Sequence, residues 1–280
     1  MLVVADSGST KCDWILSNKV DELEAVTMGF NPFFHSKEFV AAKLEENKLL
    51  VDNASKVDYV FFYGAGCSNP TRNIEINKAL EKVFKHASIH VGHDLEGAAL
   101  SVTPNKKGIA CILGTGSNST YWDGKKSIEK VPALGFTLGD EASGTYFGKI
   151  LLRDFLYNRL PREIYSYLND ELALTKESIF EGVYSKPHPN VYLASFMKIF
   201  GLFQKSDYVQ EILKNGFEQF CTFHIACYDN YKELPVHFIG SVSYYFKDEL
   251  NSVLSEKGIH MGKVVKKPIY TLYDYLKTKK

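Results

Sequence analysis

Two short segments of the sequence combine glycine with hydroxyl side chains, as phosphate-binding turns do. They are Ser7-Gly8-Ser9-Thr10-Lys11 and Gly114-Thr115-Gly116-Ser117. Glycine lets the backbone approach a phosphate closely, and successive N–H groups in a turn form a concavity that binds anions. Neither segment has the G-x-x-x-x-G-K-[ST] or G-x-G-x-x-G spacing of the better-known nucleotide loops.

For either segment alone, a plain hairpin turn is the favoured interpretation, because such turns also favour Gly and Ser. Two such segments at matching positions favour phosphate binding. Lys11 also has two interpretations: it could neutralise phosphate charge, or it could be an exposed lysine in a turn.

Three aspartates are candidates for the chemistry next to these segments. Asp6 ends an apolar run and could hold Mg²⁺ directly or through water. Asp94 follows a predicted strand, where ligands bind in open α/β sheets, and could accept the proton of an attacking hydroxyl. It could also be a helix N-cap, which local sequence alone favours. Asp140 follows Gly139, precedes a predicted helix and has the same two interpretations.

The elements around the two segments repeat. Each segment lies between an apolar strand and a second strand, residues 2–5 and 13–17 in one case and 109–113 and 119–122 in the other. This half-chain repetition predicts an α/β protein whose core is duplicated in two domains.

The remaining elements are predicted from apolar periodicity. Further strands are expected at residues 57–63, 88–91 and 236–239. Helices are expected at residues 39–50, 74–84, within 136–160, through most of 161–232, at 244–254 and near 272–280.

Composition excludes several classes of protein. Lys plus Arg and Asp plus Glu both total 33, so the basic excess of a nucleic-acid-binding protein is missing. The five cysteines contain no C-x-x-C pair, which disfavours disulfides or a zinc site and favours a reducing cytoplasm. No apolar run reaches the length of about 18 residues that a membrane span needs, and we expect no signal peptide.

Four segments in order carry a family resemblance. Residues 5–11 and 113–118 resemble the two phosphate motifs of the BadF/BadG/BcrA/BcrD ATPase family, which belongs to the actin/hexokinase/Hsp70 superfamily. Residues 135–143 are similar to the G-x-x-x-G-D-E-x-S segment of its sugar kinases, and residues 239–242 resemble the adenosine motif. Together the four segments span nearly the whole chain.

The resemblance implies two actin/hexokinase-like (ribonuclease H-like) domains with a central cleft. Residues 1–105 with 267–280 would form the first domain and residues 106–266 the second. It also implies a cytoplasmic, ATP- and Mg²⁺-dependent kinase of the N-acetylglucosamine kinase branch, which would phosphorylate an amino sugar, expected to be N-acetylglucosamine at O6. The oligomeric state stays open, a homodimer included.

Site roles follow residue by residue from the same resemblance. Asp94 matches the catalytic base and also contacts sugar, Asp140 and Asn31 match sugar-binding positions, and Gly240 with Ser241 matches the adenosine site. Residues 161–232 resemble nothing specific, so the acetamido pocket is not identified.

Two other functions compete with a kinase. The family contains ATPase activators of acyl-CoA reductases and dehydratases, which hold an iron–sulfur cluster through cysteine thiolates. Cys67 and Cys111 lie in or at the end of predicted strands rather than in that cluster motif. A nucleotide- or sugar-binding regulator without catalysis is the second alternative, disfavoured because Asp94 and both phosphate segments are retained.

Overall fold

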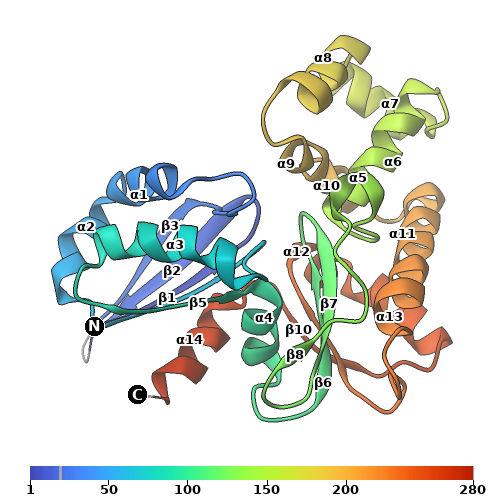
Figure 1. Cartoon of the computed structure of the whole chain (residues 1–280). Helices are drawn as coiled ribbons and strands as arrows, with labels where there is room; N and C mark the ends of the chain where they lie inside the picture. Colours follow the sequence, from blue (N-terminus) through green and yellow to red (C-terminus); the bar gives the residue numbers. More distant parts are fainter. Residues whose placement is uncertain (19–20, 280) are drawn as a thin grey trace. The chain divides into compact units, whose positions relative to one another are not determined.

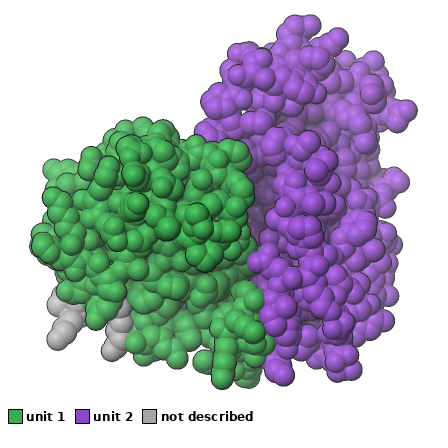
Figure 2. All heavy atoms as spheres, viewed as in Figure 1, with its two compact units in different colours: residues 1–106, 122–127, 267–280 green, residues 107–121, 128–266 purple. Residues whose placement is uncertain are grey.

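The computed structural model describes residues 1–18 and 21–279, which form two compact units. Unit 1 comprises Met1–Lys106, Trp122–Ser127 and Lys267–Lys280, and unit 2 comprises Lys107–Tyr121 and Ile128–Lys266 (Figure 2). Each unit is built on a five-stranded sheet with helices (Figure 1), which confirms the predicted α/β class.

The sheet of unit 1 has the strand order β3-β2-β1-β4-β5. Its strands are β1 (Leu2–Ser7), β2 (Lys11–Ser17), β3 (Glu22–Met28), β4 (Tyr59–Gly64) and β5 (Ser88–His93). β1, β4 and β5 are parallel, whereas β2 is antiparallel to β1 and to β3. The central strand β1 is almost wholly apolar and buried, as expected for a strand covered on both faces.

Helices cover both faces of this sheet (Figure 1). They are α1 (Lys37–Glu45), α2 (Lys48–Asn53), the short 3₁₀ helix η1 (Ala54–Lys56), α3 (Pro70–Val83), α4 (Asp94–Val102) and α14 (Ile269–Lys277). The last helix, α14, packs on α4, and its Tyr273 hydroxyl donates to Glu22 of β3 at 2.8 Å.

Unit 2 has the strand order β10-β9-β6-β7-β8. Its strands are β6 (Gly108–Leu113), β7 (Ser117–Trp122), β8 (Ser127–Ile128), β9 (Val236–Ile239) and β10 (Met261–Val265). β9 is parallel to β6 and to β10. One large apolar core joins this sheet to the helices of the unit and contains Phe147, Phe217 and Phe238.

The helices of unit 2 account for most of its length. They are α5 (Gly135–Leu138), α6 (Gly144–Leu156), α7 (Arg162–Ser166), η2 (Tyr167–Glu171), α8 (Lys176–Phe180), η3 (Glu181–Ser185), α9 (Pro189–Ala194), α10 (Met197–Leu202), α11 (Asp207–Phe220), η4 (Cys221–Ile225), α12 (Ser241–Tyr245) and α13 (Lys247–Glu256). The turns η2, η3 and η4 are π-helical. No helix of residues 1–18 and 21–279 is long and apolar enough to cross a membrane.

Candidate active site

The sheet of unit 1 brings two predicted site residues to one edge. β1, β4 and β5 are parallel and end at Ser7, Gly64 and His93, so their carboxyl ends meet at the same edge. Asp6 is the penultimate residue of β1, and Asp94 directly follows β5. The carboxyl edge of parallel strands is where ligands bind in open α/β sheets.

The Asp6 carboxyl lies in a negative environment. Burial, followed by the charges of Asp13 and Asp94, raises the pKa of Asp6 to about 7, although Lys11 acts in the opposite direction. Asp13 lies directly across from Asp6 in the β1–β2 pairing. The Lys11 ammonium binds both oxygens of Asp13 at 2.9 and 2.6 Å, so this lysine already has an anionic partner in the protein.

These groups fit a magnesium ion of the kind used in phosphoryl transfer. Two other carboxylates, those of Asp13 and Asp94, lie close enough for their charges to oppose the ionisation of Asp6, and a divalent cation would relieve that repulsion. Within the described part of the chain, no three His, Cys, Asp or Glu side chains form a metal cage. Mg²⁺ in such sites is held by one or two carboxylates together with phosphates and water, which is the mode that Asp6 can provide.

Asp94 is not a helix cap. The N-cap position of α4 is occupied by His93, and Asp94 is the first residue of the helix, so the N-cap interpretation is wrong. Its Oδ1 accepts from the Leu95 N–H and lies 2.9 Å from His93 Nε2. Oδ2 has no partner among residues 1–18 and 21–279, which leaves it able to accept a proton from a substrate hydroxyl.

The first glycine-rich segment is a tight turn between β1 and β2, with the Gly8 N–H donating to the Lys11 carbonyl at 3.0 Å. Gly8, Ser9 and Thr10 are exposed. The turn is packed against Gly29, where an added Cβ would lie 2.0 Å from the Gly8 carbonyl oxygen. Only glycine therefore fits at position 29 without displacing the turn.

Ser7 does not present its hydroxyl to this turn. The side chain is fully buried, accepts from the Phe30 N–H at 2.8 Å and donates to the Phe30 carbonyl at 3.2 Å. The expectation that the Ser7 hydroxyl donates to phosphate is therefore wrong, because both of its hydrogen-bonding functions are used inside the unit. Its role is to fix the segment that leads into Asn31.

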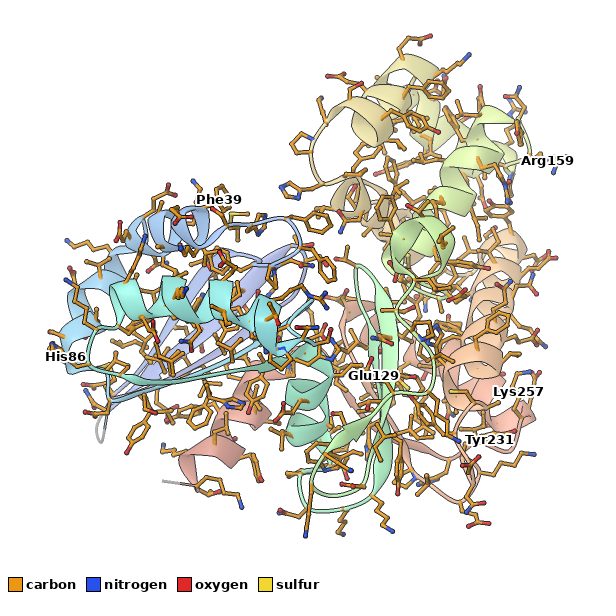
Figure 3. The ribbon with its side chains drawn as sticks, in the orientation of Figure 1. Phe39, His86, Glu129, Arg159, Tyr231 and Lys257 are labelled. Carbon is orange, nitrogen blue, oxygen red and sulfur yellow. The ribbon has the colours of Figure 1, made fainter. Side chains whose placement is uncertain are left out.

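Asn31 begins a compact turn beside the same edge. Its Oδ1 accepts from the Phe33 N–H at 2.9 Å, and its own N–H donates to His35 Nδ1 at 3.2 Å. The His35 ring stacks on Phe39 of α1, with ring centres 4.9 Å apart; Phe39 is labelled in Figure 3. The turn is thus anchored to a helix, which holds Asn31 in place.

In unit 2, the second glycine-rich segment joins β6 to β7 and is held by the start of α6. The N–H groups of Gly144 and Thr145 donate to the carbonyls of Gly114 and Thr115 at 2.8 and 3.1 Å. The Gly114 N–H donates to the Gly116 carbonyl at 3.0 Å, so the segment is a tight turn that is fixed on the start of α6.

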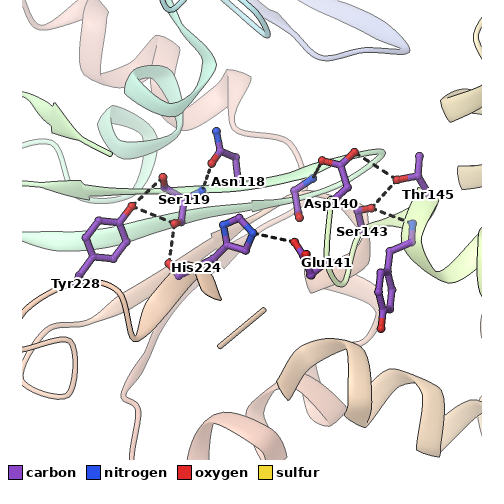
Figure 4. A network of polar contacts seen from close by, with 10 residues as sticks. Asn118, Ser119, Asp140, Glu141, Ser143, Thr145, His224 and Tyr228 are labelled. Carbon is purple, nitrogen blue, oxygen red and sulfur yellow. Dashed lines mark hydrogen bonds and ion pairs between the residues drawn. The ribbon is translucent and has the colours of Figure 1, made fainter. Parts of the chain in front are cut away.

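Asp140 packs directly on this segment (Figure 4). One carboxylate oxygen accepts from the Ser117 N–H at 3.4 Å, and an added Cβ on Gly116 would lie 3.0 Å from the other. Burial raises the pKa of the Asp140 carboxyl. Asp140 has a left-handed φ of 61°, and the N-cap of α6 is Ser143, so the capping interpretation of Asp140 is wrong. The Ser117 N–H faces a carboxylate, a contact that disfavours this group as a phosphate donor.

Figure 4 also shows a polar pair that the sequence did not indicate. His224 Nε2 lies 3.1 Å from a carboxylate oxygen of Glu141, next to Asp140. The His224 ring is buried and stacks on Phe220. The partners are 83 positions apart, and a lone histidine in a helical stretch gives no signal of such a contact.

The Gly240 turn lies beside the second segment within unit 2. β9 and β6 are parallel neighbours, so their carboxyl ends are adjacent. Gly240 has a φ of 122°, and an added Cβ would lie 2.3 Å from the Leu113 carbonyl oxygen. Ser241, which starts α12, is exposed. The adenosine-type turn and the phosphate-type turn of this unit are therefore contiguous.

Comparison with solved structures gives full-length matches. A candidate N-acetylglucosamine kinase from Porphyromonas gingivalis is 36% identical, with a TM-score of 0.93 and 98% of both chains covered. A candidate N-acetylglucosamine kinase from Chromobacterium violaceum has 16% identity and a TM-score of 0.68 over 98% of both chains. A ROK hexokinase from Thermus thermophilus has 12% identity and a TM-score of 0.51 over 99% of both chains. The last two likenesses concern the fold alone. No protein-family model and no curated protein matches the chain.

Proposed function

Because the chain belongs to the actin/hexokinase-like sugar kinases, the family of the Porphyromonas gingivalis protein, we propose that it transfers the γ-phosphoryl group of ATP to O6 of N-acetylglucosamine. The observation that carries this proposal is the meeting of Asp6, Asp94 and the Gly8–Thr10 turn at the carboxyl edge of one sheet. Phosphoryl transfer requires a carboxylate that orients the attacking hydroxyl and hydrogen-bond donors that bind the phosphates.

Asp94 is the proposed general base. Its free Oδ2 would accept the proton of the sugar hydroxyl, while the contacts of Oδ1 with the Leu95 N–H and His93 hold the carboxylate in one orientation. Phosphoryl transfer has a loose transition state, so positioning contributes more than the strength of the base.

The proposed phosphate-binding turn of unit 1 is formed by Gly8, Ser9 and Thr10, which are exposed, and that of unit 2 contains Thr115 and Gly116. Gly240 and Ser241 would contact the adenosine. Asp6 would hold Mg²⁺, which when bound neutralises charge on the transferred phosphoryl group. Lys11 is assigned to Asp13 rather than to phosphate.

Asn31 and Asp140 are the proposed sugar contacts. The turn of Asn31 is fixed by Ser7 and by His35, so its amide nitrogen can donate while Oδ1 is used internally. Asp140 is fixed by the Ser117 N–H, and burial raises the pKa of its carboxyl.

The decisive variant is Asp94→Asn, assayed by ADP release with a panel of sugars. Asn keeps the hydrogen-bond acceptor but cannot take a proton, so turnover should fall by roughly 10²–10⁴-fold. Loss of charge at the helix start should cost only about 0.3–1 kcal/mol of stability.

The matched control is Asp207→Asn, since Asp207 is the exposed first residue of α11 in unit 2. It should lose similar stability and no activity. Normal turnover by a folded Asp94→Asn enzyme would contradict the assignment of the base, and ATP binding without turnover of any sugar by the wild type would favour a regulator.

A further inference from the structure

Arg72 is a cation without an anionic partner. It is the third residue of α3, and no carboxylate lies within 4.0 Å of its guanidinium among the described residues. Nη2 donates to Ser68 Oγ at 3.3 Å, while the Nε–H is buried with no acceptor in that same set. A guanidinium has five N–H donors, so most of the donors of Arg72 have no acceptor among the residues that the structure describes.

The Phe33 ring holds the guanidinium in one orientation. The guanidinium carbon lies 4.1 Å from the centre of the ring, a close cation–π contact. Stacking covers a face of the guanidinium, whereas its N–H groups lie in the plane and point away from the ring. This arrangement resembles a preorganised donor fork, and preorganisation lowers the entropy lost on binding.

The contact partner of Arg72 belongs to the proposed sugar-binding turn. The Phe33 N–H donates to Asn31 Oδ1, and Gly66 packs against both residues, since its added Cβ would lie 2.4 Å from Asn31 Oδ1 and 3.0 Å from the Phe33 ring. Phe33 is nevertheless 58% exposed. An apolar ring so exposed on a fixed turn is typical of a binding surface rather than of core packing.

Arg72 and Asp94 also surround the same side chain. Burial, followed by the Asp94 carboxylate, raises the pKa of the Cys67 thiol to about 12, although the Arg72 guanidinium acts in the opposite direction. The thiol is therefore within electrostatic range of both groups. A sugar whose hydroxyl meets Asp94 would thus have Asn31 and Arg72 along its other edge, within unit 1.

We propose that this enzyme also accepts an amino sugar that carries a carboxylate substituent, and that Arg72, stacked on Phe33, binds that carboxylate. This inference rests on the proposed function, because it places the acceptor sugar against Asp94 and Asn31. A carboxylate matches the planar donor fork of arginine in a bidentate manner. It would also supply the anionic acceptor that Arg72 lacks.

The test compares two sugars that differ in one charged group. N-acetylmuramic acid is N-acetylglucosamine with a lactyl carboxylate on O3, remote from the O6 hydroxyl, and 3-O-methyl-N-acetylglucosamine has a neutral ether at the same position. Dissociation constants are measured by calorimetry without ATP, and kcat/KM by ADP release. Arg72→Met keeps an apolar contact with Phe33 but removes the charge, and Lys78→Met is the control on the exposed side of the same helix.

We expect the wild type to bind and phosphorylate N-acetylmuramic acid. Arg72→Met should weaken this binding by about 10- to 100-fold, the range for hydrogen bonds to a charged group. The same substitution should change the binding of N-acetylglucosamine and of 3-O-methyl-N-acetylglucosamine, which are neutral, by less than about threefold. Lys78→Met should change nothing, and Arg72→Lys should restore only part of the affinity, because an ammonium lacks the fork.

Two results would overturn the inference. One is phosphorylation of N-acetylglucosamine with no binding of N-acetylmuramic acid, which would leave the kinase function intact. The other is an equal loss for charged and neutral sugars in folded Arg72→Met, which would show that Arg72 only supports the turn. Arg72-dependent binding of N-acetylmuramic acid without turnover would instead support the anionic site and contradict the kinase function.

Discussion

His237 on β9 makes the stability of unit 2 depend on pH. Its side chain is 6% exposed, and Nδ1 accepts from the Lys263 N–H at 2.9 Å. Nε2 is buried without a partner among the described residues. Burial, followed by the positive charges of Lys263 and His260, lowers the pKa of His237 from 6.5 to about 4. The folded protein therefore keeps this ring neutral at pH values where the unfolded chain would protonate it.

The size of the effect follows from the two pKa values of His237. Because the unfolded state binds the proton more readily, the free energy of unfolding falls as pH drops from 6.5 towards 4. Between pH 8 and pH 5 the loss is about 2 kcal/mol for this one group. Below the folded pKa the loss would level off at about 3 kcal/mol.

The assay is urea unfolding followed by far-ultraviolet circular dichroism at pH 8 and pH 5. His237→Asn places an oxygen near the position of Nδ1, so it keeps an acceptor for the Lys263 N–H but cannot be protonated. The stability lost between the two pH values should be about 2 kcal/mol smaller in this variant than in the wild type. His86→Asn, at the exposed position labelled in Figure 3, is the control. Equal pH dependence of His237→Asn and wild type would refute the reasoning.

Three further substitutions test the turns. Gly29→Ala should lower the free energy of unfolding by about 1–3 kcal/mol through overpacking. It should also raise the KM for ATP, measured by ADP release, because the new methyl group overlaps the Gly8–Thr10 turn. Gly240→Ala should lower the free energy of unfolding, measured with urea, by at least about 2 kcal/mol, since it combines a positive φ with overlap on the Leu113 carbonyl. Its control is Gly201→Ala, where an added Cβ meets no other atom within 4 Å, and this variant should keep the stability of the wild type. Ser7→Ala should cost about 1–3 kcal/mol, because it leaves a buried N–H without an acceptor. Unchanged stability in all three would contradict the packing described here.

The buried parts of the fold were predictable from sequence, and the half-exposed parts were not. Continuous apolar runs such as β1 and β4 identify central strands. β3 was not predicted, because only Ala25 is buried in it, and β10 was missed because it is only partly buried and pairs irregularly. The helix expected at residues 39–50 is two helices, since the Asn47 side chain accepts from the Leu50 N–H and starts α2.

For the candidate site, the sequence predicted which residues lie at the same edge of the sheet, but not which of their polar atoms are already hydrogen-bonded within the protein. Asp6 and Asp94 were recognisable because each lies at the end of a predicted strand, and the parallel strands β1 and β5 end at one edge of the sheet. The inward hydroxyl of Ser7 depends on Phe30, 23 positions away, and neither strand nor turn propensity encodes that contact. The stacking of Arg72 on Phe33 likewise arises only when a loop and a helix from separate parts of the chain pack together.

The position of α14 affects how the protein is made on the ribosome. This helix is synthesised after the whole of unit 2, yet it belongs to unit 1, where Leu272, Tyr273 and Leu276 are buried. Domains generally fold in order from the N-terminus during synthesis. Here unit 1 cannot be completed until α14 has been synthesised, whereas the chain of unit 2 is already complete at Lys266. The surface of α4 and β1 that α14 covers therefore has to wait for its partner while all of unit 2 is made.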